Sequence, residues 1–302
     1  SLSWRTPRVN RFGHRQTSLI EYSPVRPRAR VNYGIPLRHP INDVLQLSAR
    51  LEVNEYGSLE SFQRELAVRR EMKYGEWVFS FGVRELWEDW DVGPADRSNN
   101  YLLPGVSFAH TLRGGNPTDP DSGFSQLYEF EVGEDGAGSD ITLQRAYANW
   151  RTAYRFSERH RLAGRAELGA VNFSDNSRPD LAPSLSFFAG GSQSIRGYAY
   201  QSLGPTEEVT LPDGETVSLV IGGDRLAVAS IEYQYYITPE IRAALFVDGG
   251  NAFNGDHFNA VVGAGFGVHY VSPVGAVRVD LGNPVSEDSG DWRVHITMGA
   301  EF

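Results

Sequence analysis

The chain has 302 residues, with 28 basic and 38 acidic side chains and a formal net charge of −10. Hydrophobic residues make up only 40% of it, yet 12% of its residues are aromatic and 32 are glycine, while Met occurs twice and Lys once, at Lys73. This composition excludes a helical bundle, a coiled coil and a collagen-like chain. The aromatic content is too high for a disordered chain, and the negative net charge argues against a nucleic-acid partner.

Three further features of the composition narrow the class of protein. No window holds about 18 consecutive apolar residues, so we expect no membrane-spanning helix. The chain has no cysteine, which removes disulfides, thiolate zinc sites and cysteine nucleophiles. It begins at Ser1 without the features of a signal peptide, so we expect a mature or trimmed product. Its cations are almost all Arg, whose rigid fork suits carboxylates, and we therefore expect paired charges in the interior.

Side-chain polarity alternates with a period of two along nearly the whole chain, which predicts strands rather than helices. In chain order we expect sixteen strands, near residues 1–6, 14–22, 28–34, 43–55, 62–74, 77–90, 99–111, 124–133, 141–156, 160–172, 183–189, 224–237, 241–250, 258–272, 275–283 and 291–302. An even number of antiparallel strands predicts a closed barrel with both termini on the periplasmic side.

A soluble sandwich also alternates, and three features favour a membrane barrel instead. Many predicted strands run to about 9–14 residues, which suits a tilted crossing of the hydrocarbon layer. Aromatic residues gather near the ends of the apolar faces, as in interfacial girdles. The other face carries more charge than a dry core tolerates, whereas a wet lumen accepts it. Short turns such as 24–27 and 238–240 contrast with long stretches such as 114–123 and 189–223, as periplasmic turns do with outer loops.

These patterns predict one domain over residues 1–302, a 16-stranded antiparallel transmembrane β-barrel in the outer membrane of a Gram-negative bacterium. Its sixth outer loop is long and, we expect, folds into the lumen. The seam between the first and last strands is the weakest part of the wall, because the first strand is short and makes few ladder hydrogen bonds.

The sixth loop carries the most informative motif. Phe188-Ala189-Gly190-Gly191, followed by Ser194-Ile195-Arg196-Gly197-Tyr198, resembles the sixth-loop signature of the outer-membrane assembly barrels, the superfamily of BamA, TamA and the two-partner secretion transporters. The runs 245–253 and 267–275 resemble strands thirteen to fifteen of that superfamily. The Ile-Arg-Gly-Tyr form is most similar to TamA, the outer-membrane subunit of the translocation and assembly module, although the choice between TamA and BamA stays open.

The resemblance implies a site for the loop inside the barrel. It implies that Arg196 is held against Glu232 and Asp248, which lie on the polar faces of successive predicted strands. An Arg can enter a lumen in this way if carboxylates meet it. The family pattern Gly-x-x-Glu reads Ala229-Ser-Ile-Glu232 here, and we expect the alanine to leave less room for the backbone. The other expected residues of the loop motif are Ile195, Gly197, as a tight turn, and Tyr198, as an aromatic lid.

The resemblance also implies a function, namely the insertion, assembly or translocation of outer-membrane proteins, with autotransporter-type clients. The expected route is a lateral gate between the first and last strands. Its residues are Leu2 and Trp4 at one side, and Trp292 and the terminal aromatic Phe302, part of the family's targeting signal, at the other. The expected partners are these clients, the lipid bilayer and a TamB-like inner-membrane-anchored protein. The family's N-terminal POTRA domains are absent from this sequence.

Other functions have weaker support in the sequence. A passive outer-membrane porin and a two-partner secretion transporter remain as alternatives. We expect no enzyme, no catalytic residue, no cofactor and no metal: the run 263–267 is glycine-rich but lies on a strand, and the seven His residues lack metal-ligand spacing. The acidic stretches 131–140 and 286–291 suggest solvated loops rather than calcium sites.

Overall fold

The structure is a computed structural model that describes residues 1–23, 26–115, 120–174, 181–212, 214–272, 275–287 and 290–299. Within these ranges, no helix is long and apolar enough to cross a membrane. The strands are β1 (Leu2–Thr6), β2 (Arg15–Glu21), β3 (Arg28–His39), β4 (Asp43–Tyr56), β5 (Leu59–Tyr74), β6 (Trp77–Val92), β7 (Ala95–Gly115), β8 (Pro120–Gly133), β9 (Leu143–Arg155), β10 (His160–Phe173), β11 (Thr206–Thr210), β12 (Thr216–Val220), β13 (Arg225–Tyr236), β14 (Ile241–Phe253), β15 (Val261–Ser272), β16 (Gly275–Pro284) and β17 (Arg293–Gly299).

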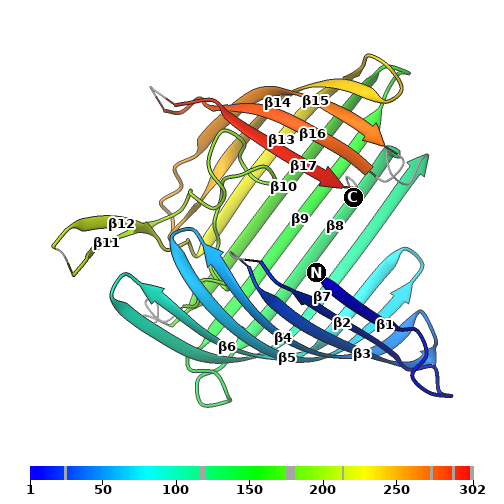
Figure 1. The fold of residues 1–302 in the computed structure, drawn as a ribbon, viewed down its shortest axis with the longest axis vertical. Helices are drawn as coiled ribbons and strands as arrows, with labels where there is room; N and C mark the ends of the chain where they lie inside the picture. The colour runs from blue at the N-terminus through cyan, green and yellow to red at the C-terminus, as the bar shows by residue number, and fades with distance from the viewer. Residues whose placement is uncertain are drawn as a thin grey trace.

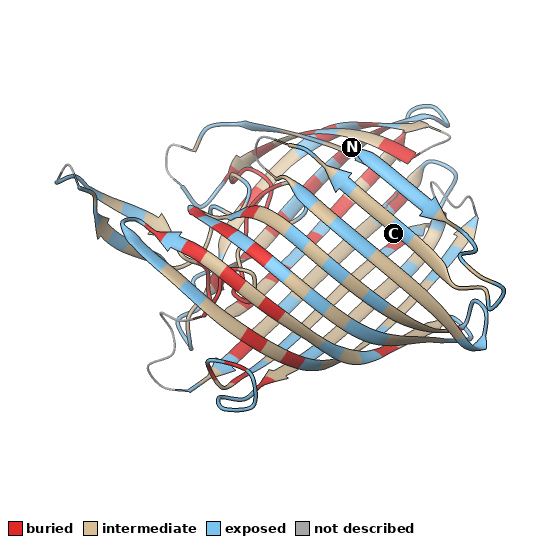
Figure 2. Cartoon of the chain, turned by 60° about the horizontal axis from the view of Figure 1, so that its bottom comes forward, coloured by how far each residue is buried: buried red, intermediate tan, exposed pale blue. Residues whose placement is uncertain are grey.

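Fifteen of these strands form one antiparallel sheet in the order β1 to β10 and then β13 to β17. The sheet curls around a central space, the lumen, and the connection between β10 and β13 folds into it (Figure 1). β11 and β12 form a separate hairpin within that connection and project away from the sheet (Figures 1 and 2). We call the end of the sheet from which this connection leaves the loop end, and the opposite end the turn end.

Within the described residues the sheet therefore has fifteen strands, and the predicted count of sixteen is not confirmed. The expected strand at 183–189 is a series of turns, in which Phe187 and Ala189 make isolated bridges to Gly223 and Leu203. Its alternating apolar side chains do not face lipid, because Leu185 and Phe187 are buried in an apolar cluster inside the sheet. A wall strand and a loop packed inside the wall show the same alternation, so the pattern alone does not distinguish them.

The odd strand count determines the directions of the two outer strands. Because neighbours in the sheet are antiparallel, β1 and β17 run in the same direction. They lie at the two edges of the sheet, and no described residue of one pairs with the other (Figure 1). The predictions of a closed barrel and of both ends of the strand series on one side are therefore wrong for the described strands.

The predicted division into short turns and long loops holds for 238–240 and 189–223 but is wrong for 24–27 and 114–123. The connection at 24–27 lies at the loop end, although we expected it to be a periplasmic turn like 238–240. The stretch 114–123 lies at the turn end, where β7 and β8 extend to Gly115 and from Pro120. Residues 189–223 do form a long connection, but it contains a hairpin whose turn signal, Pro212-Asp213-Gly214, is plain in the sequence.

The two faces of the sheet differ in chemistry. Outward-facing apolar side chains are exposed, for example Ile231 and Leu245, and exposed positions alternate with less exposed ones along the strands (Figure 2). The inner face carries paired charges: Arg84 lies 2.6 Å from Glu131, which also accepts from Arg145 at 3.3 Å. Arg84 and Arg145 thus have carboxylate partners in the interior, as the abundance of Arg predicts.

An apolar cluster fills the lumen at the loop end. It joins the loop to the inner face of the wall, and it buries the ring of Tyr198 and the side chain of Ile195. From the loop it contains Leu181, Ala182, Leu185, Phe187, Ala189, Ile195 and Tyr198, and from the wall Leu59, Leu86, Trp90, Val92, Tyr101, Leu103, Leu143, Val171, Leu226, Val228 and Ala252. The part of the loop from Leu181 to Tyr198 that enters this cluster is therefore packed like a protein core.

The exposed apolar face predicts a depth-dependent penalty for charge. Leu245 is 60% exposed on the outer face of β14, and Leu245→Arg should lower the free energy of unfolding by about 2–4 kcal/mol if that position is near the bilayer midplane. Urea titration of the protein in lipid vesicles measures this change. Ser107→Arg is the matched control, because Ser107 faces the lumen beside Glu129 and Glu131; an equal loss in both variants would contradict the assignment of the two faces.

Candidate functional site

The Arg196 side chain lies at the centre of the lumen site, where it is only 4% exposed. Its guanidinium binds Asp248 of β14 with two bonds, Nε to Oδ2 at 2.8 Å and Nη2 to Oδ1 at 3.0 Å. The Arg196 backbone N–H donates to the same Oδ2 at 3.0 Å. A bidentate pair with a third bond from the backbone fixes both the position and the orientation of this segment of the loop.

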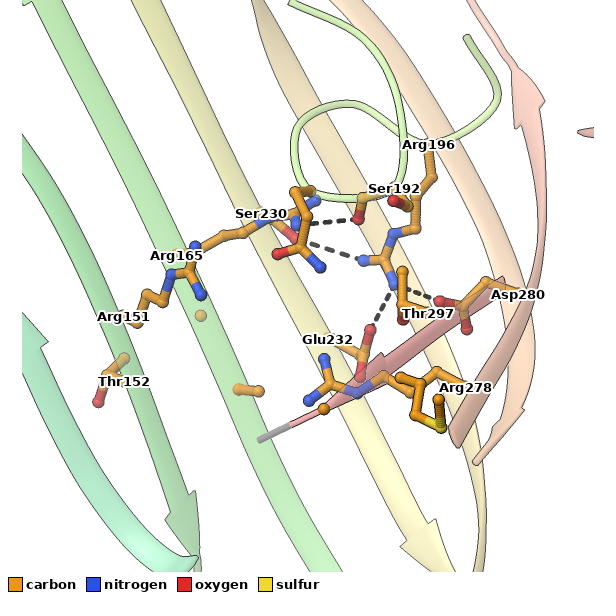
Figure 3. A pocket seen from close by; sticks show the side chains of 15 residues that line it. Arg151, Thr152, Arg165, Ser192, Arg196, Ser230, Glu232, Arg278, Asp280 and Thr297 are labelled. Carbon is orange, nitrogen blue, oxygen red and sulfur yellow. Dashed lines mark hydrogen bonds and ion pairs between the residues drawn. The ribbon is translucent and has the colours of Figure 1, made fainter. Parts of the chain in front are cut away.

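Two further strands contribute carboxylates to the same guanidinium. Arg196 Nη1 lies 2.5 Å from Glu232 Oε2 on β13 and 3.3 Å from Asp280 Oδ2 on β16. Figure 3 shows both carboxylates turned toward Arg196. Ser230 completes the contacts, since its hydroxyl donates to Asp248 at 2.5 Å and accepts from Arg196 Nη2 at 3.4 Å. One loop residue is thus bonded to β13, β14 and β16 at once.

The charge of Arg196 is secured by its surroundings. Burial alone would lower its pKa, but the bonds and charges of Asp248 and Glu232 raise the pKa above its usual range. The guanidinium carbon also lies 3.4 Å from the centroid of the Phe246 ring, a cation–π contact on the inner face of β14. The guanidinium therefore stays charged at every pH that the folded protein meets.

Small residues let the loop backbone approach the wall. Gly197 has a φ of +96°, which suits glycine, and its N–H donates to His295 Nε2 of β17 at 3.0 Å. A methyl group on Gly263 would overlap the carbonyl oxygen of Arg196, and one on Gly282 would lie 2.5 Å from the Gly197 nitrogen. The glycines of β15 and β16 therefore form a seat for the loop.

Beneath the loop, a cavity of about 90 Å³ opens between β9, β10, β13, β16 and β17 (Figure 3). Arg165 of β10 lines it and donates to the carbonyls of Ser192 at 3.2 Å and Ser194 at 2.5 Å. Its Nη2 also lies 3.4 Å from Asp248 Oδ2. Arg165 thus fastens the loop from the opposite side of the seat, and residues Thr297–Gly299 of β17 border the same cavity.

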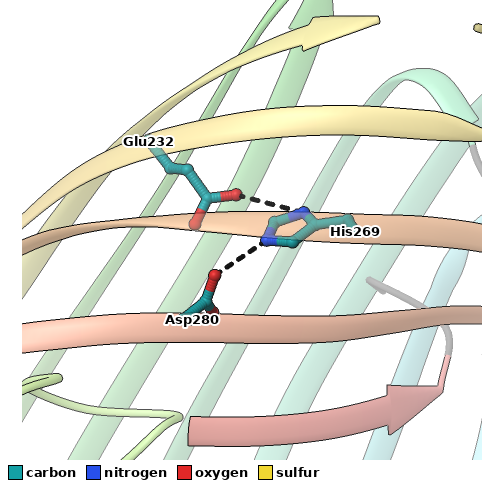
Figure 4. A group of neighbouring side chains, drawn as sticks. All are labelled: Glu232, His269 and Asp280. Atoms are coloured by element: carbon teal, nitrogen blue, oxygen red, sulfur yellow. Dashed lines mark hydrogen bonds and ion pairs between the residues drawn. The ribbon is translucent and has the colours of Figure 1, made fainter. Parts of the chain in front are cut away.

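Glu232, His269 and Asp280 form a group that could by geometry hold a metal ion, since their ligand atoms lie within 4.8 Å of one another. His269 Nε2 is 2.9 Å from Asp280, and its Nδ1 lies 3.9 Å from Glu232 (Figure 4). The same Nδ1 accepts from Arg242 Nε at 3.3 Å. Nε2 therefore carries the hydrogen and donates to Asp280. Because Arg196 already binds both carboxylates, a metal ion would have to displace it, and we assign the group to the seat of the loop.

The structure places the other predicted residues as follows. Ala229 is exposed on the outer face of β13, so the expected loss of room beside the loop is wrong. Leu2 and Trp4 are 69% and 67% exposed on β1, at one edge of the sheet. Trp292 precedes β17 at the other edge and packs on Phe266 at a centroid distance of 5.7 Å. Phe302 lies outside the described residues.

The sequence analysis missed several residues that contact Arg196 or its neighbours in the loop: Phe246, Asp280, His295 and Arg165. Each lies on the lumen side of its strand, so the alternation was a signal for orientation. It could not say which lumen residues face the loop, because that depends on how tightly the sheet curls.

The Arg196 seat predicts a large loss of stability on truncation. Arg196→Ala leaves Glu232, Asp248 and Asp280 close together without their shared cation, so we expect a loss of about 3–5 kcal/mol of unfolding free energy. Thermal or urea unfolding in vesicles measures it. Arg28→Ala is the control, because the Arg28–Glu21 pair has side chains 45% and 35% exposed and should contribute less than about 1 kcal/mol. Similar losses in both would refute the special role of Arg196.

The glycine seat yields a second prediction. Gly263→Ala should displace the loop and destabilise the protein by about 1–3 kcal/mol, because the new methyl group overlaps the Arg196 carbonyl. The matched variant is Gly249→Ala on β14, where the nearest atom to the added methyl is 3.7 Å away. Its change should stay within about 0.5 kcal/mol. If the two variants unfold at the same urea concentration, the loop does not rest on Gly263.

Comparison with known proteins identifies the family. The Omp85 superfamily domain matches residues 3–302, so the chain belongs to the Omp85 superfamily. Barrels of this superfamily lie in the outer membrane of Gram-negative bacteria, and this chain is an outer-membrane protein. The "Outer membrane protein assembly factor BamA" of Nitratidesulfovibrio vulgaris is 29% identical over 183 residues, which cover 57% of this chain and 22% of that protein. The predicted resemblance is confirmed for the superfamily, while the closer likeness to TamA stays a prediction.

Solved structures share the fold. The barrel of BamA from Haemophilus ducreyi lacking POTRA domains 1–3 matches with a TM-score of 0.78 at 15% identity, over 95% of this chain and 63% of that one. CdiB from Escherichia coli matches with a TM-score of 0.56 at 12% identity, over 96% of this chain and 57% of that one. The chain thus spans less than two thirds of these relatives, and the likeness concerns the fold of their barrels.

Proposed function

We propose that this Omp85-superfamily barrel inserts, assembles or translocates other outer-membrane polypeptides, and that the edges of its sheet at β1 and β17 form the lateral gate. The observation that supports the proposal is that, among the described strands, β1 and β17 each pair on one side only, in a sheet whose lumen holds a seated loop. The function needs no chemical step and no cofactor. The domain assignment that goes with it is one barrel over residues 1–302.

The physical reason lies in the backbone. Lipid offers no hydrogen bonds, so unpaired N–H and C=O groups at an edge within the hydrocarbon layer carry a high free-energy cost. β1 and β17 run in the same direction, so one strand that runs the opposite way can pair antiparallel with both. A client segment gains main-chain hydrogen bonds at these edges by β-augmentation. The exposed apolar side chains of Leu2, Trp4 and Trp292 would face lipid at this gate.

Strand β1 is the weaker edge. It pairs with β2 through five residue pairs, and β2 pairs with β3 through seven, whereas β4 and β5 share fourteen. Few ladder bonds make local opening easier. We therefore place the moving side of the gate at β1 and β2 and the fixed side at β16 and β17, which the loop contacts through Asp280 and His295.

A passive porin needs an open lumen, and the loop core argues against it. Apolar packing and the Arg196 seat occupy the lumen at and below the loop end. The likeness of the loop motif to TamA adds a narrower proposal, in which the clients are of the autotransporter type and a TamB-like inner-membrane-anchored protein is the partner. Copurification of such a partner with the full-length protein tests that part separately.

The gate can be tested with single cysteines, because the chain has none of its own. Ser3→Cys on β1 should form a disulfide with a cysteine placed in the transmembrane strand of a client during assembly. Ser48→Cys on β4 is the matched control, since β4 is paired on both sides. Crosslinks of equal yield at both positions, or none at Ser3→Cys while the client assembles, would rule out entry at this edge.

A further inference from the structure

A buried carboxylate on the wall opposite the Arg196 seat also holds the loop. Glu88 of β6 has no exposed surface. Its Oε1 accepts from Ser61 Oγ at 2.7 Å and from the backbone N–H of Ser184 at 3.2 Å, and its Oε2 accepts from Ser184 Oγ. Ser184 belongs to the loop, so two of these three bonds join the loop to β6.

The partners of Glu88 among the described residues are neutral, in contrast to those of Asp248. The cation on the same face of the strand, Arg84, is bonded to Glu131 and Glu65. A buried carboxylate is costly unless hydrogen bonds satisfy it. An apolar side chain would fill the same space without that cost, so what Glu88 contributes is the positioning of its two donors on Ser184.

The neighbouring wall strand makes a similar bond. The hydroxyl of Tyr101 on β7, itself fully buried, accepts from the backbone N–H of Ala182 at 2.9 Å. Residues 182 and 184 are thus fastened to β7 and β6, and Leu185 and Phe187 continue into the apolar cluster. Residues 182 and 184 lie 14 and 12 residues before Arg196 and are held by a separate set of contacts.

The base of the β11–β12 hairpin contacts the connection between β4 and β5, next to the strands that hold residues 182 and 184. The Ser58 N–H donates to the Val220 carbonyl at 3.4 Å, and the Val220 N–H donates to Ser58 Oγ at 3.2 Å. The contact with the β2–β3 connection is looser: the Arg26 guanidinium lies 5.1 Å from the ring centroid of Tyr200, which is 60% exposed. The loop is therefore tied firmly to β5–β7 and more weakly to the strands before β4.

We propose that Glu88 is a positioning residue that anchors the loop to β6, and that the loop clamps the wall of β5–β7 to the wall of β13–β16 through two separate anchors, Glu88 and Arg196. The clamp holds the middle of the sheet at a fixed curvature, so opening at its edges is confined to the strands before β4. This consequence for the gate rests on the proposed function, whereas the anchor itself does not.

The labelling rate of a buried cysteine tests the anchor in the absence of any client. Ala182→Cys is introduced into the cysteine-free protein in lipid vesicles and treated with a membrane-impermeant maleimide. We expect slow labelling with Glu88 present and about tenfold faster labelling in Glu88→Ala, because losing the anchor opens this segment locally. Glu88→Gln keeps an acceptor oxygen and should fall between the two.

Three comparisons make the outcome decisive. Asp91→Asn, on the outer face of the same strand, should leave the labelling rate unchanged. Arg196→Ala should also leave it nearly unchanged, because the two anchors are separate; if it accelerates labelling as much as Glu88→Ala does, the loop moves as one body and the proposal fails. It fails equally if Glu88→Ala labels at the original rate.

Only protein that migrates as a folded, heat-modifiable barrel is counted, which separates local release from unfolding. If Glu88→Ala does not fold, Ser184→Ala removes one donor and should accelerate labelling about threefold. An unchanged rate in that variant overturns the anchor. Client assembly is measured separately in the same variants. If the labelling rates follow the prediction but no client is assembled, the proposed function fails while the anchor stands.

Discussion

A guanidinium buried inside a protein must have its charge compensated, and at Arg196 three carboxylates from three strands do so. The relative positions of β13, β14 and β16 are therefore tied to one side chain of the loop. Removing the cation would leave three like charges close together on one side of the lumen. The compensation works in both directions, because the carboxylates need the loop as much as the loop needs them.

The sheet separates lipid from the lumen, and the side chains on each face suit the environment that the face contacts. Apolar side chains such as Ile231 point outward, while the inner face holds ion pairs such as Arg84–Glu131 that hydrocarbon would not accept. The loop core at one end of the lumen is a third environment, dry and apolar. Glu88 lies at its border, where it receives hydrogen bonds from Ser61 and Ser184.

Much of this arrangement is readable from the sequence, because a period of two assigns each side chain to one face. It placed Glu232 and Asp248 in the lumen, and the loop motif singled out Arg196. The period could not show that 183–189 packs inside the wall, since buried loops and strands alternate alike. Nor could it show that Asp280 joins the site, because partners 84 residues apart meet through the curl of the sheet.

The chain order of the seat has a kinetic consequence. Arg196 is synthesised before every carboxylate that binds it: Glu232, Asp248 and Asp280 follow by 36, 52 and 84 residues. Early strands can form from local hairpins, but contacts at such separations form late. The contacts of Arg196 are therefore complete only once β16 is in place. A barrel that lacks β16 would hold Arg196 through Glu232 and Asp248 alone, so its loop would be only partly fastened while the sheet is still growing.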